Sequence, residues 1–207
     1  TRPAGAVALG AAVALAAAPA LLPLATGTEN GDLSIGAVQG NVPQAGAPWD
    51  SQARQVTANH AAGTHALLDE VQPGELDLVL WPESSADIDP RSDAELADMV
   101  SEAADAIDAP VMLGTQRFET DPDAPPEQPD QQVRYNEVIT WQPDTGPVED
   151  LVYAKQLPVP FGEYMPYRDF FRMFTEAVDL IGTDMLAGND PGILHVPLAG
   201  ADESVAV

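Results

Sequence analysis

The sequence predicts an α/β fold in which helices cover a largely buried sheet. Three observations support this prediction. Short apolar runs of strand length alternate with longer amphipathic segments through the first part of the chain. Apolar residues make up 45% of the sequence, which is enough for a sizeable core. Further along, two alternating runs flank residues 142–146, whose Pro-Asp-Thr-Gly composition indicates a hairpin turn.

The first part of the domain is predicted to run strand, helix, strand, helix, strand. Asp50 and Ser92 are available as N-caps of the two helices, and Pro73-Gly74 closes the first of them. The second strand reads Leu-Asp-Leu-Val-Leu-Trp, a nearly continuous apolar run that is expected of a strand buried on both faces. The strands are expected at 33–38, 76–81 and 111–114, and the helices at 51–71 and 92–107.

The later part is predicted to contain a hairpin, a short helix and two further strands. Residues 121–130 hold four prolines and four acidic residues, so this segment must be an exposed loop. The expected ranges are 133–141 and 148–153 for the hairpin, 169–180 for the helix, and 193–196 and 204–207 for the strands.

The N-terminal segment favours a membrane span. Residues 4–25 carry no charge and are long enough to cross a bilayer. Arg2 precedes them and acidic residues follow, which places the domain outside the cytoplasm by the positive-inside tendency. A signal peptide and a buried Ala-rich helix are the alternatives. We expect a transmembrane helix and linker over 1–28, the last span of a preceding bundle, and a catalytic domain over 29–207.

The charge balance limits the possible partners. The net charge is −25, and the acidic residues are scattered along the chain rather than gathered in one block. This pattern predicts a solvated acidic shell, as in proteins adapted to high salt. At high salt, the repulsion between this shell and anionic lipid head groups would be screened. The same pattern excludes nucleic acid, which requires clustered Lys and Arg.

Metal, cofactor and thiol chemistry find no support within these residues. The sequence contains no cysteine, so it has neither a disulfide nor a thiol nucleophile of its own. His60 and His65 are five residues apart, which places them on different sides of a helix rather than at one metal. Both are expected on the helix surface, and we expect neither a metal nor a cofactor.

Lys155 is the only lysine in the chain, which otherwise uses arginine for positive charge. An ammonium shifts its pKa readily when buried, whereas a guanidinium stays protonated. Lys155 precedes a rigid Pro-Val-Pro-Phe-Gly turn that ends at Glu163. This setting makes Lys155 a candidate for chemistry. The alternatives are an ordinary surface lysine, or a Lys155–Glu163 pair that only fixes a loop.

Glu83 follows the apolar strand predicted at 76–81, within Leu-Trp-Pro-Glu-Ser-Ser. In α/β folds, sites assemble at the ends of strands. Desolvation at such a position raises the pKa of a carboxyl, which suits a general base. Ser84 and Ser85 adjoin it, but no neighbouring histidine could activate them as nucleophiles.

These motifs resemble a known family. Glu83 and Lys155, in the contexts Leu-Trp-Pro-Glu-Ser-Ser and Lys-x-x-Pro-Val-Pro-Phe-Gly-Glu-Tyr, resemble the Glu-Lys-Cys enzymes of the nitrilase superfamily. More narrowly, the chain is similar to the apolipoprotein N-acyltransferase family. Val-Gln-Gly-Asn-Val-Pro-Gln at 38–44, Trp49 after it and the Tyr135-Asn136 pair agree with that family. The resemblance covers about residues 33–200.

The resemblance implies an incomplete nitrilase-like α-β-β-α sandwich on the extracytoplasmic face of a multi-pass cell-membrane protein. It also implies an acyl transfer from a phospholipid, through a cysteine thioester, to the α-amino group of a diacylglyceryl-lipoprotein. Glu83 would deprotonate the thiol, Lys155 would stabilise the oxyanion, and Glu163 would position Lys155. Substrate contacts would come from four residues: Trp49 near the lipid entrance, Asn136, Phe161 and Tyr164.

The sequence departs from the family pattern at the nucleophile. The family's cysteine lies in a Cys-Tyr-Glu motif after a strand, and residues 203–207 are similar to the strand that leads to it. We therefore expect a chain truncated at both ends and inactive by itself. A nitrilase-type amidase and a non-catalytic acidic binding domain are the alternative functions. Upstream hydrophobic spans would favour the acyltransferase, and a Ser, Ala or Gly in place of the cysteine would favour the binding domain.

Overall fold

The computed structural model describes residues 32–42, 46, 48–190, 192–198 and 204–206. All of these except residue 32 belong to one compact unit, Leu33–Val207. The transmembrane helix predicted within 1–28 lies outside the described residues. In the part of the chain that is described, no helix combines the length and the apolar character needed to cross a membrane.

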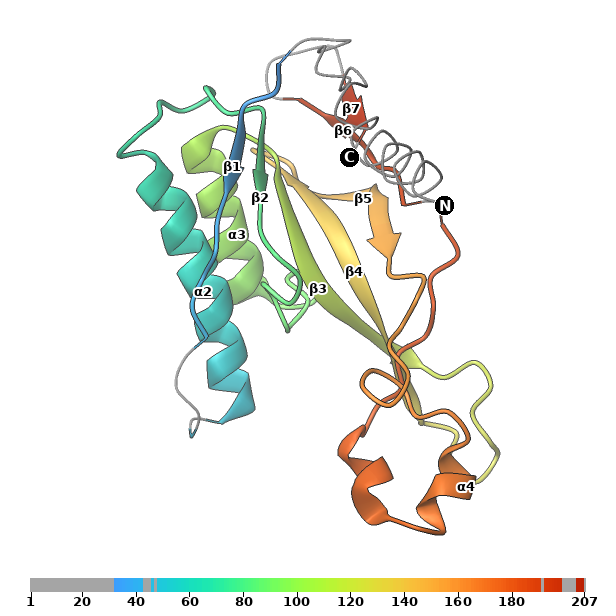
Figure 1. Cartoon of the computed structure of the whole chain (residues 1–207). Helices are drawn as coiled ribbons and strands as arrows, with labels where there is room; N and C mark the ends of the chain where they lie inside the picture. Colours follow the sequence, from blue (N-terminus) through green and yellow to red (C-terminus); the bar gives the residue numbers. More distant parts are fainter. Residues whose placement is uncertain (1–31, 43–45, 47, 191, 199–203, 207) are drawn as a thin grey trace, which may run out of the picture. The chain divides into compact units, whose positions relative to one another are not determined.

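A five-stranded mixed sheet forms the centre of this unit, in the order β1-β2-β3-β4-β5 (Figure 1). The first three strands are parallel, and the next two continue the sheet as antiparallel neighbours. The strands are β1 (Ile35–Ala37), β2 (Leu78–Leu80), β3 (Val111–Thr120), β4 (Gln132–Gln142) and β5 (Gly146–Ala154). Two helices connect the parallel strands, α2 (Trp49–Leu67) and α3 (Ala94–Ile107). The predicted α/β class is confirmed.

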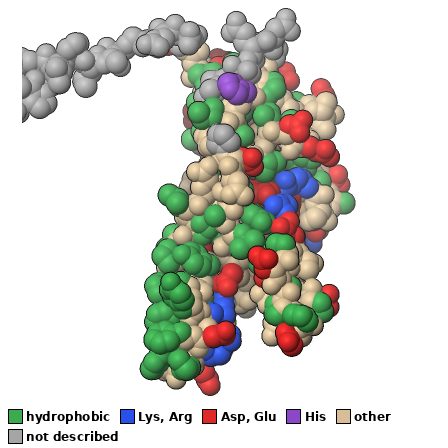
Figure 2. All heavy atoms as spheres, turned by 90° about the vertical axis from the view of Figure 1, so that its right-hand side faces the viewer, with side chains coloured by type: hydrophobic (Ala, Val, Ile, Leu, Met, Phe, Trp, Pro, Cys, Tyr) green, Lys and Arg blue, Asp and Glu red, His purple; other side chains and the backbone are tan. Residues whose placement is uncertain are grey.

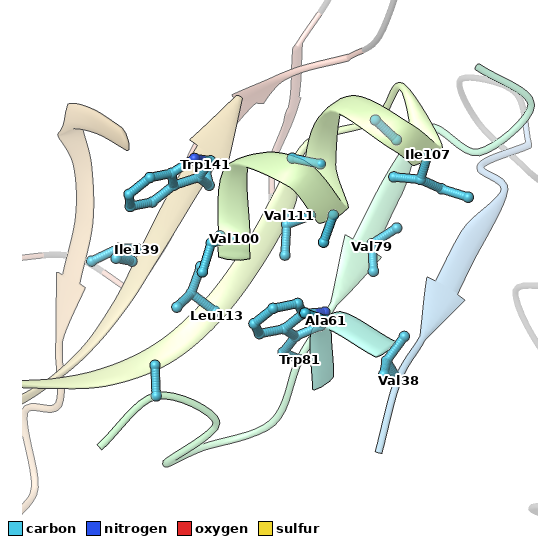
Figure 3. Packing of buried hydrophobic residues seen from close by; sticks show 14 of the residues in the cluster. Val38, Ala61, Val79, Trp81, Val100, Ile107, Val111, Leu113, Ile139 and Trp141 are labelled. Atoms are coloured by element: carbon cyan, nitrogen blue, oxygen red, sulfur yellow. The ribbon is translucent and has the colours of Figure 1, made fainter. Parts of the chain in front are cut away.

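Both long helices cover the same face of the sheet. Asp93 caps α3, because its side chain accepts a hydrogen bond from the amide of Leu96; the predicted cap was the preceding residue, Ser92. The buried residues of α3 recur at helical spacing and contact alternate residues of β3 and β4 (Figure 3). The core on this face includes Val79, Trp81, Val100, Ile107, Val111, Leu113, Ile139 and Trp141.

The opposite face of the sheet has a smaller core. Leu78 and Met112 point to this face and contact Leu194 and Val196. Val196 lies in β6 (His195–Pro197), which pairs with β7 (Ser204–Ala206) as a second, two-stranded sheet. In the described residues, this face therefore has no covering helix comparable to α2 and α3. The four-layer α-β-β-α sandwich stays a prediction. Its first two layers are the helices α2 and α3 and the five-stranded sheet, and the described residues supply only these two in full.

Two predicted elements differ from the observed ones. The helix predicted at 169–180 is interrupted, and α4 (Arg168–Arg172) is followed by a separate 3-10 helix, η2 (Glu176–Leu180). Thr175 lies between them in an extended conformation, and its side chain caps η2 by accepting a hydrogen bond from the amide of Ala177. β3 is longer than predicted, because residues 111–120 pair along their whole length with β4.

His60 is not on the helix surface as predicted. Its side chain is buried, and its ring lies 5.5 Å from the ring of Trp81. Nδ1 is 2.8 Å from the carbonyl oxygen of Val56, and burial lowers the pKa of the imidazole. Gly40 packs against the ring so closely that a Cβ there would lie 2.5 Å from Nδ1. His65 is exposed as expected.

Acidic side chains are distributed over the molecular surface. On the face shown in Figure 2 they lie scattered among polar and hydrophobic groups, with few basic side chains between them. This dispersed arrangement agrees with the spacing of acidic residues along the sequence. The adaptation to high salt stays a prediction.

Candidate active site

Glu83 lies just beyond the C-terminal end of β2, where the chain passes over β3. The amide of Trp81 donates to the carbonyl of Met112 (2.8 Å), and the amide of Ala86 donates to the carbonyl of Gly114 (3.0 Å). Ser85, which is buried, accepts a hydrogen bond from the amide of Gly114 through its hydroxyl (3.1 Å). Its hydroxyl thus helps to hold the loop on β3.

Gly114 allows this loop to approach β3. A Cβ at Gly114 would lie 2.8 Å from Cα of Glu83 and 2.8 Å from the carbonyl oxygen of Pro82. The backbone beside Glu83 therefore requires glycine at this position. The role of Gly114 is not evident from the sequence, because a glycine within a strand pattern indicates a close approach only after its neighbour is known.

Lys155 directly follows β5, and its amide donates to the carbonyl of Asn136 on β4 (2.8 Å). Glu163 is carried by the turn that comes after. The amide of Glu163 donates to the carbonyl of Val159 (2.8 Å), and Phe161 adopts a left-handed φ of 63°. The compact turn predicted from Pro-Val-Pro-Phe-Gly therefore returns Glu163 to the lysine.

The three predicted catalytic side chains meet at the ammonium group of Lys155. Its Nζ lies 2.7 Å from Oε1 of Glu163 and 3.2 Å from Oε1 of Glu83. Asn136 donates a further hydrogen bond from Nδ2 to the same oxygen of Glu83. Glu163 accepts a second hydrogen bond at Oε2 from the amide of Val159 (2.7 Å). The cation is thus held between two carboxylates from different parts of the chain.

This arrangement favours the ionised forms of Lys155 and Glu163. The hydrogen bond to Glu163, with a smaller contribution from Glu83, raises the pKa of Lys155 above its ordinary value despite partial burial. Burial of Glu163 by itself would raise the pKa of its carboxyl. The hydrogen bonds from Lys155 and Val159 outweigh this effect, so the pKa of Glu163 lies below its ordinary value.

The carboxylate of Glu83 is not desolvated as the sequence predicted. Its side chain is 59% exposed, whereas that of Glu163 is 19% exposed. β2 ends at Leu80, and Glu83 lies in the loop after it with its side chain exposed. The prediction of desolvation was therefore wrong, because an apolar strand does not bury the residue that follows it.

A cavity of about 200 Å³ opens beside these side chains. Glu83, Asn136 and Lys155 supply its polar wall, and the remaining lining is mainly apolar: Trp81, Pro82, Gly114, Val138 and Tyr153. A small apolar cavity with a few convergent polar groups is the usual form of a ligand site. The cavity could accommodate an uncharged group whose polar atom faces Lys155.

The four predicted substrate residues are not all in this cavity. Asn136 lines it and contacts Glu83. Trp49 is 60% exposed and lines a neighbouring cavity of about 180 Å³, which Glu83 also borders. Phe161 contacts Phe171 edge to face, with ring centroids 5.4 Å apart. Neither Phe161 nor Tyr164 is among the residues that line the two cavities.

Comparison with known proteins agrees with the motifs. No protein-family model matches the sequence. The chain is 39% identical over 176 residues to the apolipoprotein N-acyltransferase of Mycolicibacterium smegmatis (strain ATCC 700084 / mc(2)155). This match covers 82% of the chain and 28% of that protein, so the chain spans less than a third of this relative.

A solved structure was also found, that of a CN-hydrolase superfamily protein from Xanthomonas campestris with an arsenic adduct in its active site. The sequences are 18% identical, the TM-score is 0.39, and the match covers 83% of this chain and 51% of that one. This TM-score is too low to assign a fold. The sequence identity, in contrast, confirms the resemblance inferred from the motifs: the chain is a homologue of part of the apolipoprotein N-acyltransferases.

Proposed function

We propose that this chain supplies the general base and the oxyanion-binding cation of an apolipoprotein N-acyltransferase. The observation that carries the proposal is the contact of Lys155 with both Glu83 and Glu163 at the edge of a mostly apolar cavity. The 39% identity to an enzyme of that name supports the same reaction class. The nucleophilic thiol would come from a cysteine outside these residues, because the sequence contains none.

The two carboxylates differ in a way that supports separate roles. Both oxygens of Glu163 accept hydrogen bonds, one from Lys155 and one from Val159. Both hydrogen bonds to Glu83 go to Oε1, and no described residue donates to Oε2. Since Oε2 is free to take a proton, Glu83 is the general base and Glu163 is the group that orients Lys155.

Lys155 has one donor left for substrate. A protonated lysine has three N–H groups, and two of them point to Glu83 and Glu163. The third can donate to a carbonyl oxygen in the cavity, where it would stabilise negative charge that develops on that oxygen. Asn136 holds Glu83 at the same time, so the base and the cation keep a fixed separation.

The proposed reaction has two balanced halves. First, Glu83 takes the proton of the thiol, and the sulfur attacks the ester carbonyl of a phospholipid. The C–O bond breaks, and Glu83 returns the proton to the departing alcohol, which leaves a thioester. Second, Glu83 takes a proton from the attacking α-amino group of a diacylglyceryl-lipoprotein. The C–S bond breaks, the amide forms, and the proton returns to the sulfur. Both substrates are lipids, so the proposed location is a membrane surface.

Lys155→Arg tests this proposal in a longer protein that contains this chain and supplies the cysteine. A guanidinium is planar and bulkier than an ammonium, and it cannot occupy the same position between two carboxylates. We expect N-acylation of a synthetic diacylglyceryl lipopeptide, measured by mass spectrometry with phospholipid in detergent, to fall by about a hundredfold or more.

Arg54→Lys provides the matched control. Arg54 also lies among carboxylates, those of Asp50, Asp93 and Glu95, but it does not line the cavity beside Lys155. This variant should keep its activity. N-acylation at the normal rate by Lys155→Arg would remove the proposed role of Lys155. Hydrolysis of small amides without N-acylation by the unmodified protein would instead favour a nitrilase-type amidase.

A further inference from the structure

We propose that residues 184–188, here named the positioning segment, hold Lys155 and Glu163 at their working separation, with Gly188 and Asp184 as the positioning residues. The inference rests on the proposed function, because that function requires the two side chains to stay in contact. It assigns a role to a part of the chain that contributes no side chain to the cavity beside Lys155.

The positioning segment contacts the backbone of both residues of the ion pair. The amide of Gly188 donates to the carbonyl of Lys155 (2.9 Å). The amide of Met185 donates to the carbonyl of Glu163, also at 2.9 Å. Lys155 and Glu163 are eight residues apart in sequence, yet both are fixed by residues three apart on one extended stretch. Their separation is therefore set by the geometry of that stretch.

The sheet in turn fixes the positioning segment. The carbonyl of Asp184 accepts a hydrogen bond from the amide of Arg134 (3.0 Å), and the amide of Leu186 donates to the carbonyl of Arg134 (2.9 Å). These two bonds form a parallel bridge between Arg134, on β4, and Met185. Met185 is buried. The same strand carries Asn136, which contacts Glu83. All three catalytic residues are therefore connected to β4 by hydrogen bonds, directly or through the positioning segment.

Gly188 packs directly against the residue before Lys155. A Cβ at Gly188 would lie 2.3 Å from the carbonyl oxygen of Ala154 and 2.6 Å from its Cβ. The nearest of these atoms belong to the backbone at the end of β5, which cannot move away as a flexible side chain could. Any side chain at Gly188 must therefore displace either the positioning segment or Lys155.

Asp184 links the turn that bears Glu163 to the same segment. Its Oδ1 accepts a hydrogen bond from the amide of Met165 (2.9 Å), two residues after Glu163. The same oxygen accepts a hydrogen bond from Nη2 of Arg168 at 2.5 Å. Glu163 is thus fixed on one side by Met185 and on the other by Asp184.

The single lysine permits a direct test of this inference. In the 207-residue chain labelled with isotopic lysine, one side-chain NMR signal reports Lys155. In the unmodified protein this signal should titrate above the ordinary lysine pKa, because of Glu163 and Glu83. Gly188→Ala should move the titration back toward the ordinary value, as should Glu163→Gln, which removes the carboxylate itself.

Gly182→Ala is the matched control, because a Cβ at Gly182 meets no atom within 4 Å. It should leave the titration of Lys155 unchanged. If Gly188→Ala also leaves the titration unchanged in a folded protein, the proposal is wrong. If Gly188→Ala does not fold, Asp184→Ala takes its place and should lower the pKa of Lys155. Asp184→Asn, which keeps an acceptor for Met165, should restore it in part. An unchanged titration in Asp184→Ala would then overturn the proposal.

An activity measurement separates this inference from the proposed function. In a longer, cysteine-containing protein, Gly188→Ala should lower N-acylation by about a hundredfold, because small displacements of reacting groups are costly. Gly182→Ala should not. A changed titration in Gly188→Ala, together with full activity of Lys155→Arg, would contradict the proposed function but leave the positioning role intact.

Discussion

Adjacent residues of β4 belong to two ionic clusters on opposite faces of the sheet. Asn136 faces the cavity and contacts Glu83, which also contacts Lys155. Glu137 points to the other face, since side chains alternate along a strand. There it contacts Arg91 at 2.5 Å and Arg117 at 2.7 Å. Both clusters combine carboxylates with cations, so their composition alone does not distinguish them.

The difference lies in how completely each carboxylate is paired. Glu137 is 3% exposed, and each of its oxygens accepts a hydrogen bond from a different arginine. Glu83 is 59% exposed and keeps one oxygen without a donor among the described residues. A buried carboxylate whose two oxygens both accept hydrogen bonds has no free oxygen for a proton, whereas a carboxylate with a free oxygen beside a cavity can exchange one. This incomplete pairing supports the proposal that the cluster around Lys155 is the one that carries out chemistry.

The largest effect on stability is expected for Glu137→Ala. This change leaves Arg91 and Arg117 without their shared carboxylate between β3, β4 and the loop before α3. Arg91 keeps its contact with Asp89 and Arg117 keeps its contact with Glu119, so the loss of the two charge-assisted hydrogen bonds to the buried carboxylate should cost about 2–3 kcal/mol. Urea unfolding followed by circular dichroism would measure the loss.

Glu83→Ala is the matched comparison. Because Glu83 is half exposed, its removal should change the free energy of unfolding by less than about 1 kcal/mol. Equal losses in the two variants would mean that the two clusters do not differ in the way described.

Gly114→Ala should have an intermediate effect. The added Cβ would lie 2.8 Å from the backbone of Glu83, so the loop must move or the strand must bend. Strain of this kind costs about 1–3 kcal/mol. The same unfolding measurement should detect it, with Gly182→Ala as the unstrained control. A stable Gly114→Ala variant would show that Glu83 is not held as closely as the structure indicates.

The smallest effect concerns the pH dependence of Glu163→Gln. The pKa of Glu163 is lowered, so its contribution to stability is present above the ordinary glutamate pKa and lost as pH falls through the lower folded value. The pKa of Lys155 is raised, so its contribution is present below the ordinary lysine pKa and lost as pH rises through the higher folded value.

The unmodified protein should therefore exceed Glu163→Gln in stability mainly between these limits, by about 1 kcal/mol or less because the pair is partly exposed. Unfolding free energies measured across the pH range would reveal this window. A difference that stays constant from acid to alkaline pH would indicate that the pair contributes no titrating interaction.

The sequence singled out Glu83, Lys155 and Glu163, because each lies in a distinctive local motif, and the structure brings their side chains into contact. Their catalytic roles stay a proposal. Gly114 and the positioning segment could not be predicted, since their roles depend on contacts between parts of the chain far apart in sequence. The prediction that His60 lies on the helix surface was wrong for a related reason. Helical spacing places His60 and His65 on different sides of the helix, but it does not show which side is buried. That follows only from the contacts of the His60 ring with Trp81 and Gly40.

The fold class was predictable because alternation of strand-like and helical patterns is a property of local sequence. The single short helix expected at 169–180 was not found, because Thr175 adopts an extended conformation and begins a new turn there. Amphipathic spacing indicates which residues share a face, but it does not show whether a capping side chain interrupts the helix.

We propose that Glu83 acts as the base, whereas the buried cluster around Glu137 has only a structural role. The most direct test is acylation of the cysteine itself, in a longer protein that supplies it, with labelled phospholipid and no acceptor. Mass spectrometry should find about one acyl group per molecule as a thioester in the unmodified protein. Glu83→Gln, folded to the same extent, should form almost none. Thioester formation at the unmodified rate in Glu83→Gln would show that Glu83 is not the base.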